Sequence, residues 1–392
     1  MALAVSLLTL TACAPAPEPV ATAREIESHA GPGSMAPNLA LGANGTLYLS
    51  WIEPEDAGHA LRFATFVDGR WSTPLTIATG QDWFVNWADF PAMAALADGT
   101  LAAHWLVKSG EDTYAYDVHV ALSHDGGRTW GAPFILHDDG TQTEHGFVSL
   151  VAAGGSFRAV WLDGRETVDG GAMTLRSAVV DSDGRVHDDA LIDDKVCDCC
   201  QTDAVLMDDG AAVVVYRDRT DSEIRDVSTA RLFDDQWSSP RSVHDDRWLM
   251  PACPVNGPAV AVVGGSLGCA WFTADADRQG RVQIAFSDDG GKTFGPPVPV
   301  DEGDPGGRVD LVMTEGGSAL VVWLEGAKVV VRRVDRTGRL GPAIAVATST
   351  EERASGFPRM ARTGDRVVIA WTQPGDPSVV RTAVLSLDQL SP

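Results

Sequence analysis

Residues 97–105 read ADGTLAAHW, a tight glycine turn followed by a short apolar run that ends in an aromatic residue. Six other segments repeat this pattern, and their closing aromatic residues lie 48 to 56 residues apart. The seven closing residues are Trp51, Trp105, Trp161, Tyr216, Trp271, Trp323 and Trp371. Spacing this regular predicts an internal repeat of about 52 residues, each copy forming one unit of supersecondary structure.

Each copy contains the signals of four short strands. An apolar segment precedes the glycine turn, and a third and a shorter fourth segment follow the closing aromatic residue. Four alternating strands per repeat predict an all-β propeller of about seven four-stranded blades over residues 24–392. The last copy lacks a fourth strand. We therefore expect residues 24–28, which precede the first full copy, to complete the last blade and close the ring.

The first residues carry a targeting signal rather than a structural one. Residues 2–12 are apolar or small and end in Leu10-Thr11-Ala12-Cys13, which resembles the bacterial lipobox. The resemblance implies a signal peptide over residues 1–13, lipidation of Cys13 and a flexible tether over residues 14–23. We expect a bacterial lipoprotein at the periplasmic or outer face of the envelope, which contacts the membrane only through its lipid anchor.

Charge excludes two classes of partner. The net charge of −24 argues against nucleic acid, whose phosphates need a basic face, and against adsorption to anionic lipid. No apolar run is long enough to form a transmembrane helix. We expect a monomer whose partner is a small molecule or a glycan.

Two turns carry a second signature. Residues 123–130 (SHDGGRTW) and 287–294 (SDDGGKTF) resemble the Asp-box of the sialidase (BNR) superfamily. Asp125 and Asp289 are placed to accept backbone N–H groups in a glycine turn, over Trp130 and Phe294. The resemblance implies a six-bladed ring as the alternative to seven blades. It also implies exo-α-sialidase-like hydrolysis of an acidic sugar, although the chain lacks the Arg-Ile-Pro tripeptide of that family.

Four cysteines are expected at one rim of the ring. Cys197, Cys199 and Cys200 enter the fourth repeat, and Cys253 enters the fifth. Adjacent repeats place their entry loops side by side, so the thiols are expected to form disulfides, to bind copper or zinc, or to act as redox thiols. His145 and His244 are candidate nitrogen ligands for such a metal. Cys269, within a strand pattern, is expected in the core.

The loops of the same face carry the candidate ligand-binding residues. The segment 216–226 holds three arginines that could clamp a carboxylate, as sialidases do, or form a solvated ion-pair network. The candidate catalytic residues are Asp89, Arg217, Arg219, Glu223 and Arg225. The candidate ligand-binding residues are Trp83, Trp87, Arg165, Trp248, Asn256, Arg308 and Arg359. Tyr114 and Tyr116 are the available sialidase-type nucleophiles, and packing between blades is the alternative role of the aromatic residues.

Three functions follow from these patterns. The first is a cell-envelope, sialidase-like propeller that binds or hydrolyses an acidic glycan. The second is a copper or zinc protein built on the cysteines. The third is a non-catalytic scaffold for a protein partner. We adopt the first, with a ligand-binding face and catalysis left open.

Overall fold

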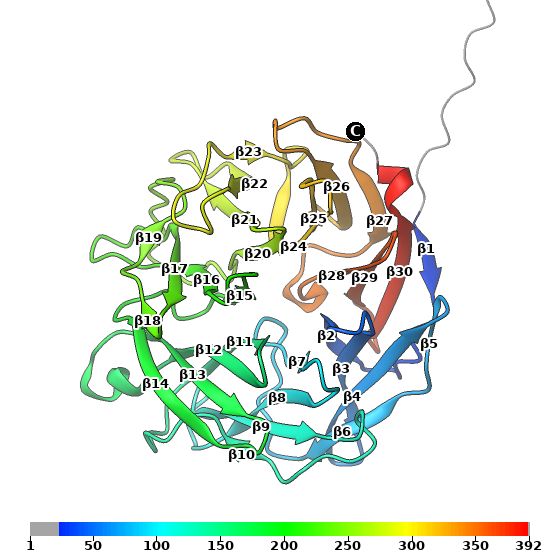
Figure 1. Ribbon diagram of the computed structural model, residues 1–392, viewed down its shortest axis with the longest axis vertical. Coiled ribbons are helices and arrows are strands. Elements are labelled where there is room, and N and C mark those ends of the chain that lie inside the picture. The colour runs from blue at the N-terminus through cyan, green and yellow to red at the C-terminus, as the bar shows by residue number, and fades with distance from the viewer. Residues whose placement is uncertain (1–22, 391–392) are drawn as a thin grey trace, which may run out of the picture.

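A computed structural model describes residues 23–390, and it arranges them as seven antiparallel sheets in a ring (Figure 1). The chain is a seven-bladed β-propeller, so the six-bladed alternative is wrong. The predicted lipidation of Cys13, the signal peptide and nearly all of the tether lie outside the described residues. Within residues 23–390, no helix has the length and apolar character needed to cross a membrane.

The strands follow one another around the ring, from the innermost to the outermost strand of each blade. Blade 1 contains β2 (Met35–Leu41), β3 (Leu47–Glu55), β4 (Gly58–Val67), β5 (Arg70–Trp71) and β6 (Leu75–Gly80), the last two both paired with β4. Blade 2 contains β7 (Ala92–Ala95), β8 (Leu101–Lys108), β9 (Tyr116–Ser123) and β10 (Phe134–Ile135). Blade 3 contains β11 (His145–Ala153), β12 (Ser156–Asp163), β13 (Thr174–Asp181) and β14 (Val186–Asp193). Blade 4 contains β15 (Asp203–Leu206), β16 (Ala212–Arg217), β17 (Val227–Phe233), β18 (Gln236–Trp237) and β19 (Arg241–Ser242).

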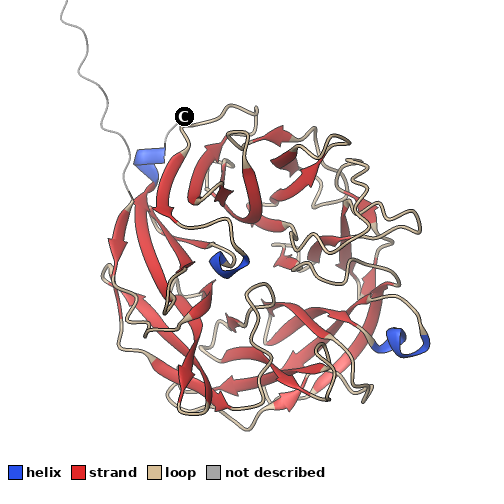
Figure 2. Ribbon diagram, turned by 180° about the vertical axis from the view of Figure 1, so that it is seen from behind, coloured by secondary structure: helices blue, strands red, loops and turns tan. Residues whose placement is uncertain are grey.

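The remaining blades keep the same order. Blade 5 contains β20 (Ala259–Val263), β21 (Ser266–Ala274), β22 (Gly280–Ser287) and β23 (Val298–Pro299). Blade 6 contains β24 (Pro305–Met313), β25 (Ala319–Glu325), β26 (Lys328–Val334) and β27 (Ile344–Thr348). Blade 7 contains β28 (Arg359–Thr363), β29 (Arg366–Gln373), β30 (Val379–Ser386) and β1 (Arg24–Ile26). Three short 3₁₀ helices, η1 (Arg165–Asp169), η2 (Arg353–Ser355) and η3 (Leu387–Leu390), lie outside the sheets (Figure 2).

The N-terminal strand closes the ring, as the repeat pattern predicts. β1 is the outermost strand of blade 7 and pairs antiparallel with β30, with Arg24 opposite Val384 and Ile26 opposite Thr382 (Figure 1). Sharing one blade between the two ends of the chain joins the first blade to the last, and it leaves fewer unpaired edges.

The closing aromatic residue of each repeat is a core residue of its blade. All seven are buried. In three blades the indole N–H donates to a carboxylate two residues further along the strand, as Trp51 does to Glu53 at 2.8 Å. The same pairs are Trp161 with Asp163 and Trp323 with Glu325. Each indole therefore contributes apolar burial, and its polar N–H keeps a partner at the end of the strand.

The two predicted Asp-box turns have the expected hydrogen bonds. Asp125 Oδ1 accepts the Thr129 N–H at 2.9 Å, and its Oδ2 accepts the Thr129 hydroxyl at 2.7 Å. Asp289 makes the same two bonds to Thr293. These bonds lower the pKa of Asp125, which is half-buried, to about 2. Trp130 and Phe294 pack against the cores of their blades, so both turns have a structural role.

Candidate functional site

The chemically rich loops gather at one face of the ring. In each blade the first strand starts at this face, and the connection between the second and third strands returns to it. We call it the entry face, formed by residues 81–91, 109–115, 136–144, 164–173, 194–202, 218–226 and 243–258. Isolated bridges join these loops to each other and to strand ends, including Val196 to Asp218 and Ile224 to Leu249. The first strands also line a central channel of about 560 Å³.

A buried phenol on the entry face joins two carboxyl groups. The Tyr116 hydroxyl, at the start of β9, lies 2.7 Å from Glu144 Oε1 and 3.1 Å from Asp89 Oδ2. The other oxygen of Asp89 accepts the Phe147 N–H at 2.8 Å. A phenol has one proton, and an ionised carboxylate can only accept. Both short contacts are therefore hydrogen bonds only when one of the two carboxyl groups is protonated.

Burial selects which group holds that proton. Burial, together with the nearby Asp89 and Asp198 carboxyls, raises the pKa of Glu144 to about 8, although the Tyr116 hydrogen bond lowers it. Burial raises the pKa of Asp89 to about 7, while the Phe147 and Tyr116 hydrogen bonds lower it. Glu144 is thus the more strongly protonated group at neutral pH, with its hydroxyl donating to Tyr116 and Tyr116 donating to Asp89.

A pocket of about 540 Å³ opens beside Glu144. Its walls come from the loops of blades 2, 3 and 4 and include Tyr114, Asp198 and Arg219. The Tyr114 side chain is exposed, and behind it Phe84 stacks on the Tyr116 ring with centroids 4.0 Å apart. The pocket therefore offers a protonated carboxyl, a second carboxyl and an exposed aromatic ring.

Arginines and acids form a chain along one side of this pocket. Arg219 binds both oxygens of Glu223, at 2.8 Å and 3.2 Å. Arg225 donates to Glu223 at 2.9 Å and to Asp198 at 3.2 Å. Hydrogen bonds from both arginines lower the pKa of Glu223. Three predicted catalytic residues thus lie together, but as an ion-pair chain in which each guanidinium already has a carboxylate.

Arg217 lies behind that chain, inside the wall. It is 1% exposed and donates to the backbone carbonyls of Asn256, Arg225 and Phe272 at 2.6–2.7 Å. Its guanidinium also stacks over the Trp248 ring at 4.7 Å. In this structure Arg217 joins loops of blades 4 and 5, and its donors are directed at the backbone.

The four predicted rim cysteines do come together. The Sγ atoms of Cys197, Cys199 and Cys200 lie within 4.8 Å of one another, and Cys199 Sγ lies within 4.8 Å of Cys253 and of an Asp198 oxygen. The five described cysteines are all free thiols. Burial alone would raise the pKa of Cys197, but hydrogen bonds from its two neighbours and the Arg225 guanidinium lower it well below the ordinary value. Cys269 is buried in β21, as expected.

The remaining predicted ligand-binding residues are engaged with other side chains or with the backbone. Trp83 bridges to Val107, and its ring lies 5.7 Å from Trp105. Trp87 stacks on Phe357 under the Arg308 guanidinium, which is 4.6 Å away.

Arg308, Arg359 and Asn256 are likewise engaged with backbone groups or with other side chains. Arg308 also donates to the carbonyls of Glu352 and Gly356 at 3.1 Å. Arg359 pairs with Asp310 at 3.3 Å, and the Asn256 side chain accepts the Arg308 N–H at 2.7 Å. A ligand-binding role for these residues remains a prediction.

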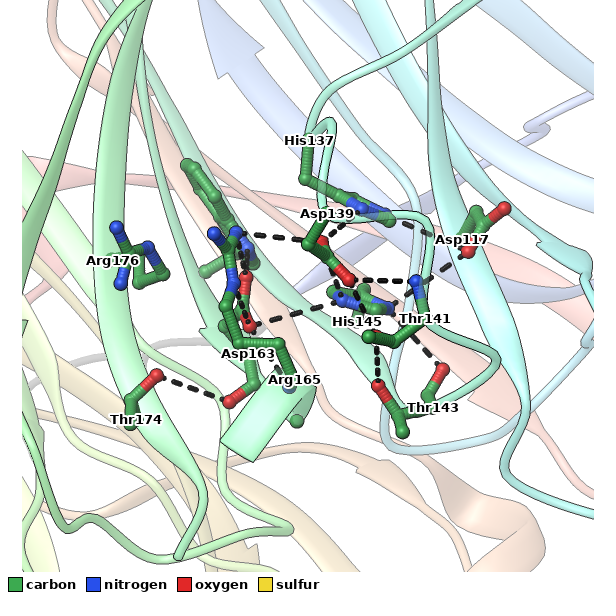
Figure 3. A network of polar contacts seen from close by, with 12 residues as sticks. Asp117, His137, Asp139, Thr141, Thr143, His145, Asp163, Arg165, Thr174 and Arg176 are labelled. Atoms are coloured by element: carbon green, nitrogen blue, oxygen red, sulfur yellow. Dashed lines mark hydrogen bonds and ion pairs between the residues drawn. The ribbon is translucent and has the colours of Figure 1, made fainter. Parts of the chain in front are cut away.

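His145 belongs to a different network from the cysteines (Figure 3). Its ring stacks on His137 with centroids 3.7 Å apart, and Asp139 Oδ2 lies 2.9 Å from His137 Nδ1 and 3.2 Å from His145 Nε2. Arg165 binds both oxygens of Asp163 at the edge of this network, at 2.7 and 2.8 Å. Since Glu144 directly precedes His145, the network fixes the backbone that carries the protonated carboxyl.

Glu144 is the site residue that sequence reasoning missed. It lies immediately before the first strand of blade 3, much as Asp89 lies shortly before that of blade 2. That shared position was the available signal, but the pairing through Tyr116 depends on how two blades meet.

Comparisons with known proteins agree on the fold. No family model and no curated protein matches the chain. A protein of unknown function from Dyadobacter fermentans is 16% identical with a TM-score of 0.52, covering 93% of this chain and 97% of its own. The Penicillium chrysogenum α-L-arabinanase complexed with arabinobiose is 14% identical with a TM-score of 0.51, covering 95% and 98%. The K499G mutant of NanB sialidase from Streptococcus pneumoniae is 8% identical with a TM-score of 0.51, covering 94% and 95%. Such identities show the fold alone.

Proposed function

We propose that the chain binds a neutral carbohydrate in the entry-face pocket and hydrolyses it with Glu144 as the general acid. The observation that carries this proposal is the Glu144 carboxyl at the pocket wall beside Asp198, held 2.7 Å from a Tyr116 hydroxyl that also contacts Asp89. The fold is shared with an arabinanase and a sialidase, which are glycoside hydrolases, so the scaffold suits this chemistry.

Glycoside hydrolysis needs two carboxyl groups in different protonation states. Glu144 would transfer its proton to the glycosidic oxygen as the bond breaks. The Tyr116 hydroxyl would then donate its single proton to the resulting carboxylate, while Asp89 keeps the Phe147 N–H. Asp198, paired with Arg225, would act on the other side of the sugar, as a base toward water or as a nucleophile. The exposed Tyr114 ring offers a face on which a sugar can stack.

The charges favour a neutral sugar over the acidic sugar expected from the sequence. A carboxylate clamp needs guanidinium groups free to bind the ligand. Arg219 and Arg225 are instead paired with Glu223, and the pocket is also lined by Asp112 and Asp198. An acidic sugar would therefore meet repulsion here, whereas hydroxyl groups could bond to these carboxylates.

Hydrolysis of defined oligosaccharides tests the proposal. The full chain is incubated with arabino-oligosaccharides and, separately, with sialyllactose, and released sugar is measured. We expect turnover of the neutral substrate and a loss of about 10²–10⁴-fold in Glu144→Gln, which keeps the shape but holds no transferable proton. The matched control is Glu111→Gln, the same substitution at an exposed carboxyl that does not line the pocket, and it should turn over substrate like wild type. Equal turnover by wild type and Glu144→Gln, or turnover of sialyllactose alone, would refute this assignment.

The anchor predicted at Cys13 is a separate proposal. We propose that the lipobox-like residues 10–13 direct the chain to the bacterial envelope, where its pocket meets extracellular glycan. Metabolic labelling with a fatty acid should mark the wild-type chain and leave Cys13→Ser unlabelled. An unlabelled wild-type chain in a bacterial host that lipidates a control lipoprotein would argue against the anchor.

A further inference from the structure

The cysteine cluster, consisting of Cys197, Cys199 and Cys200, lies at the edge of the proposed sugar pocket without being used by it. Cys197 Sγ is 3.8 Å from Cys199 Sγ and 3.3 Å from Cys200 Sγ. Four thiolates around one Zn²⁺, with Zn–S bonds of about 2.3 Å, stand about 3.8 Å apart. A disulfide would need about 2.05 Å. The Cys197–Cys199 distance is that of sulfur atoms around a common cation, the Cys197–Cys200 distance is about 0.5 Å shorter, and neither is short enough for a disulfide.

Hydrogen-bond donors point at the sulfur atoms from the surrounding wall. Arg225 Nη1 is 3.1 Å from Cys197 Sγ, and the Asn256 backbone N–H is 3.4 Å from Cys200 Sγ. Arg225 is itself 3% exposed, so this contact is a buried charge directed at a thiol. Buried donors around sulfur stabilise thiolate, the form that binds metals, and they orient the ligands in metal sites.

The two loops that carry the cysteines are held rigidly. The Gln201 side chain donates to the Gly257 carbonyl at 3.1 Å and accepts the Gly257 N–H at 2.8 Å. A Cβ at position 257 would lie 1.9 Å from the Gln201 carbonyl oxygen, so this close approach requires glycine. Cys197 N–H also bonds to the Arg217 carbonyl at 3.0 Å. The sulfur atoms are therefore positioned by the backbone before any ligand arrives.

We propose that Cys197, Cys199 and Cys200 bind one thiophilic d¹⁰ cation, Zn²⁺ or Cu⁺, on the entry face. Both ions favour thiolate ligands in low coordination numbers. Binding replaces the thiol protons with S–metal bonds and releases those protons to solvent.

Cys253 completes the site from the neighbouring blade. Its thiol is exposed, and it lies within 4.8 Å of Cys199 Sγ. A small shift of the exposed residues 251–253, which lie outside the Gln201–Gly257 contact, would bring it to the fourth position of a tetrahedral site. The site thereby links the entry loops of blades 4 and 5, and Asp198, between two of its ligands, lines the sugar pocket.

The competing outcome is a pair of disulfides, Cys197 with Cys200 and Cys199 with Cys253. Each pair is close enough to form with a local rearrangement, and an oxidising compartment would favour it. Two disulfides would remove every metal ligand, so the two outcomes exclude each other.

Metal uptake by the full chain is the test. The protein is reduced without oxygen, exposed to Zn²⁺ or Cu⁺ in separate arms and dialysed, and the metal-to-protein ratio is measured. Co²⁺ replacement adds a spectroscopic signature, because thiolate-to-cobalt charge transfer appears only when sulfur is bound. We expect one equivalent in wild type, and loss of the metal and of the charge-transfer band in Cys197→Ser and Cys200→Ser.

Cys269→Ser is the matched control, because Cys269 is equally buried but lies in β21, outside the cluster. It should bind metal like wild type, and circular dichroism should show that all variants are folded. Cys253 is exposed, so Cys253→Ser should fold even if the variants at the buried cysteines do not. It should bind the metal more weakly than wild type. Native chain with both disulfides by mass spectrometry, and no metal uptake after reduction, would overturn the proposal. Glu144→Gln should bind metal like wild type, because Glu144 is not a ligand. Failure of the metal proposal can therefore be distinguished from failure of the carbohydrate proposal.

Discussion

Tyr116 carries a single proton between the buried Asp89 and the half-buried Glu144, and this shortage is the basis for proposing Glu144 as a proton donor. Among the described side chains the phenol is the hydrogen-bond partner that both carboxyl groups share, and Asp89 has the Phe147 N–H in addition. On the arginine side of the pocket, by contrast, each guanidinium is already paired with a carboxylate. One wall of the pocket therefore carries carboxyl groups that share a proton donor, and the other carries paired charges.

Removing the phenol oxygen should destabilise the protein. Tyr116→Phe leaves Glu144 and Asp89 buried without their shared partner, at a cost of about 1–3 kcal/mol in the free energy of unfolding. Urea denaturation measures this change. Tyr114→Phe, at an exposed ring nearby, should change stability by about 0.5 kcal/mol or less. Equal effects of the two substitutions would mean that the Tyr116 contacts contribute nothing.

At the scale of single elements, the turn after β9 is stabilised by side-chain bonds and by glycine. The turn places Gly126 and Gly127 at φ +75° and +84°, a region that other residues rarely adopt. Ser123 Oγ accepts the Gly127 N–H at 2.9 Å, and Phe63 of the preceding blade lies directly against Gly127. The turn is therefore also a contact between blades 1 and 2.

The two glycines should respond differently to alanine. A Cβ at Gly127 would lie 2.2 Å from Phe63 Cζ, whereas a Cβ at Gly126 would meet nothing within 4 Å. Gly126→Ala should cost about 1–2 kcal/mol from backbone strain alone. Gly127→Ala should cost about 1–3 kcal/mol more, because Phe63 must move. Thermal unfolding would compare them, and a Gly127→Ala variant as stable as Gly126→Ala would disprove the contact between blades.

Much of the fold and part of the site are predictable from the sequence, for different physical reasons. The repeat of Trp51 and its six equivalents predicts the blades, because burial of one aromatic per blade requires the same local pattern each time. The cysteine loops converge as expected, because blade order alone places entry loops 194–202 and 243–258 side by side. Asp89 and Glu144 come from different blades, and their pairing depends on side-chain depth, which no linear pattern records.

The contacts of the three arginines likewise could not be predicted from the sequence. Their grouping in residues 217–225 is compatible with a carboxylate-binding site or with an ion-pair network. Only the structure shows which groups each guanidinium contacts. Arg217 points to backbone carbonyls, whereas Arg219 points to Glu223. A charged side chain in a loop thus predicts an ion pair more securely than it predicts a ligand-binding role.

At the scale of the whole molecule, the ring depends on the short strand β1. Ile26 is buried in the core between blades 7 and 1, and its carbonyl accepts the Thr382 hydroxyl at 2.8 Å. Ile26→Ala should lower the free energy of unfolding by about 2–4 kcal/mol. Glu25→Ala, on the exposed side of the same strand, should cost about 0.5 kcal/mol or less. Chemical denaturation gives both values, and an Ile26→Ala variant as stable as Glu25→Ala would refute closure by β1.

The stability of the whole molecule should also reflect the buried Glu144. Its pKa of about 8 in the folded chain exceeds its ordinary value, so the folded state holds the proton over a pH range where the unfolded state has lost it. The stability that Glu144 contributes is therefore full below about pH 4 and is lost as pH rises to about 8. Glu144→Gln cannot ionise, so its stability should rise relative to wild type between pH 5 and pH 9. If the difference in the free energy of unfolding between the two proteins stays constant with pH, folding does not raise the pKa of Glu144.

The protonation of Glu144 at neutral pH is the central claim, and infrared spectroscopy tests it without any ligand. The spectrum of wild type minus Glu144→Gln at pH 6.5 should contain the carbonyl stretch of a protonated carboxyl, and this band should decline with a midpoint near pH 8. A difference spectrum that shows only an ionised carboxylate at pH 6.5 would contradict the account, because Glu144 would then have no proton to give.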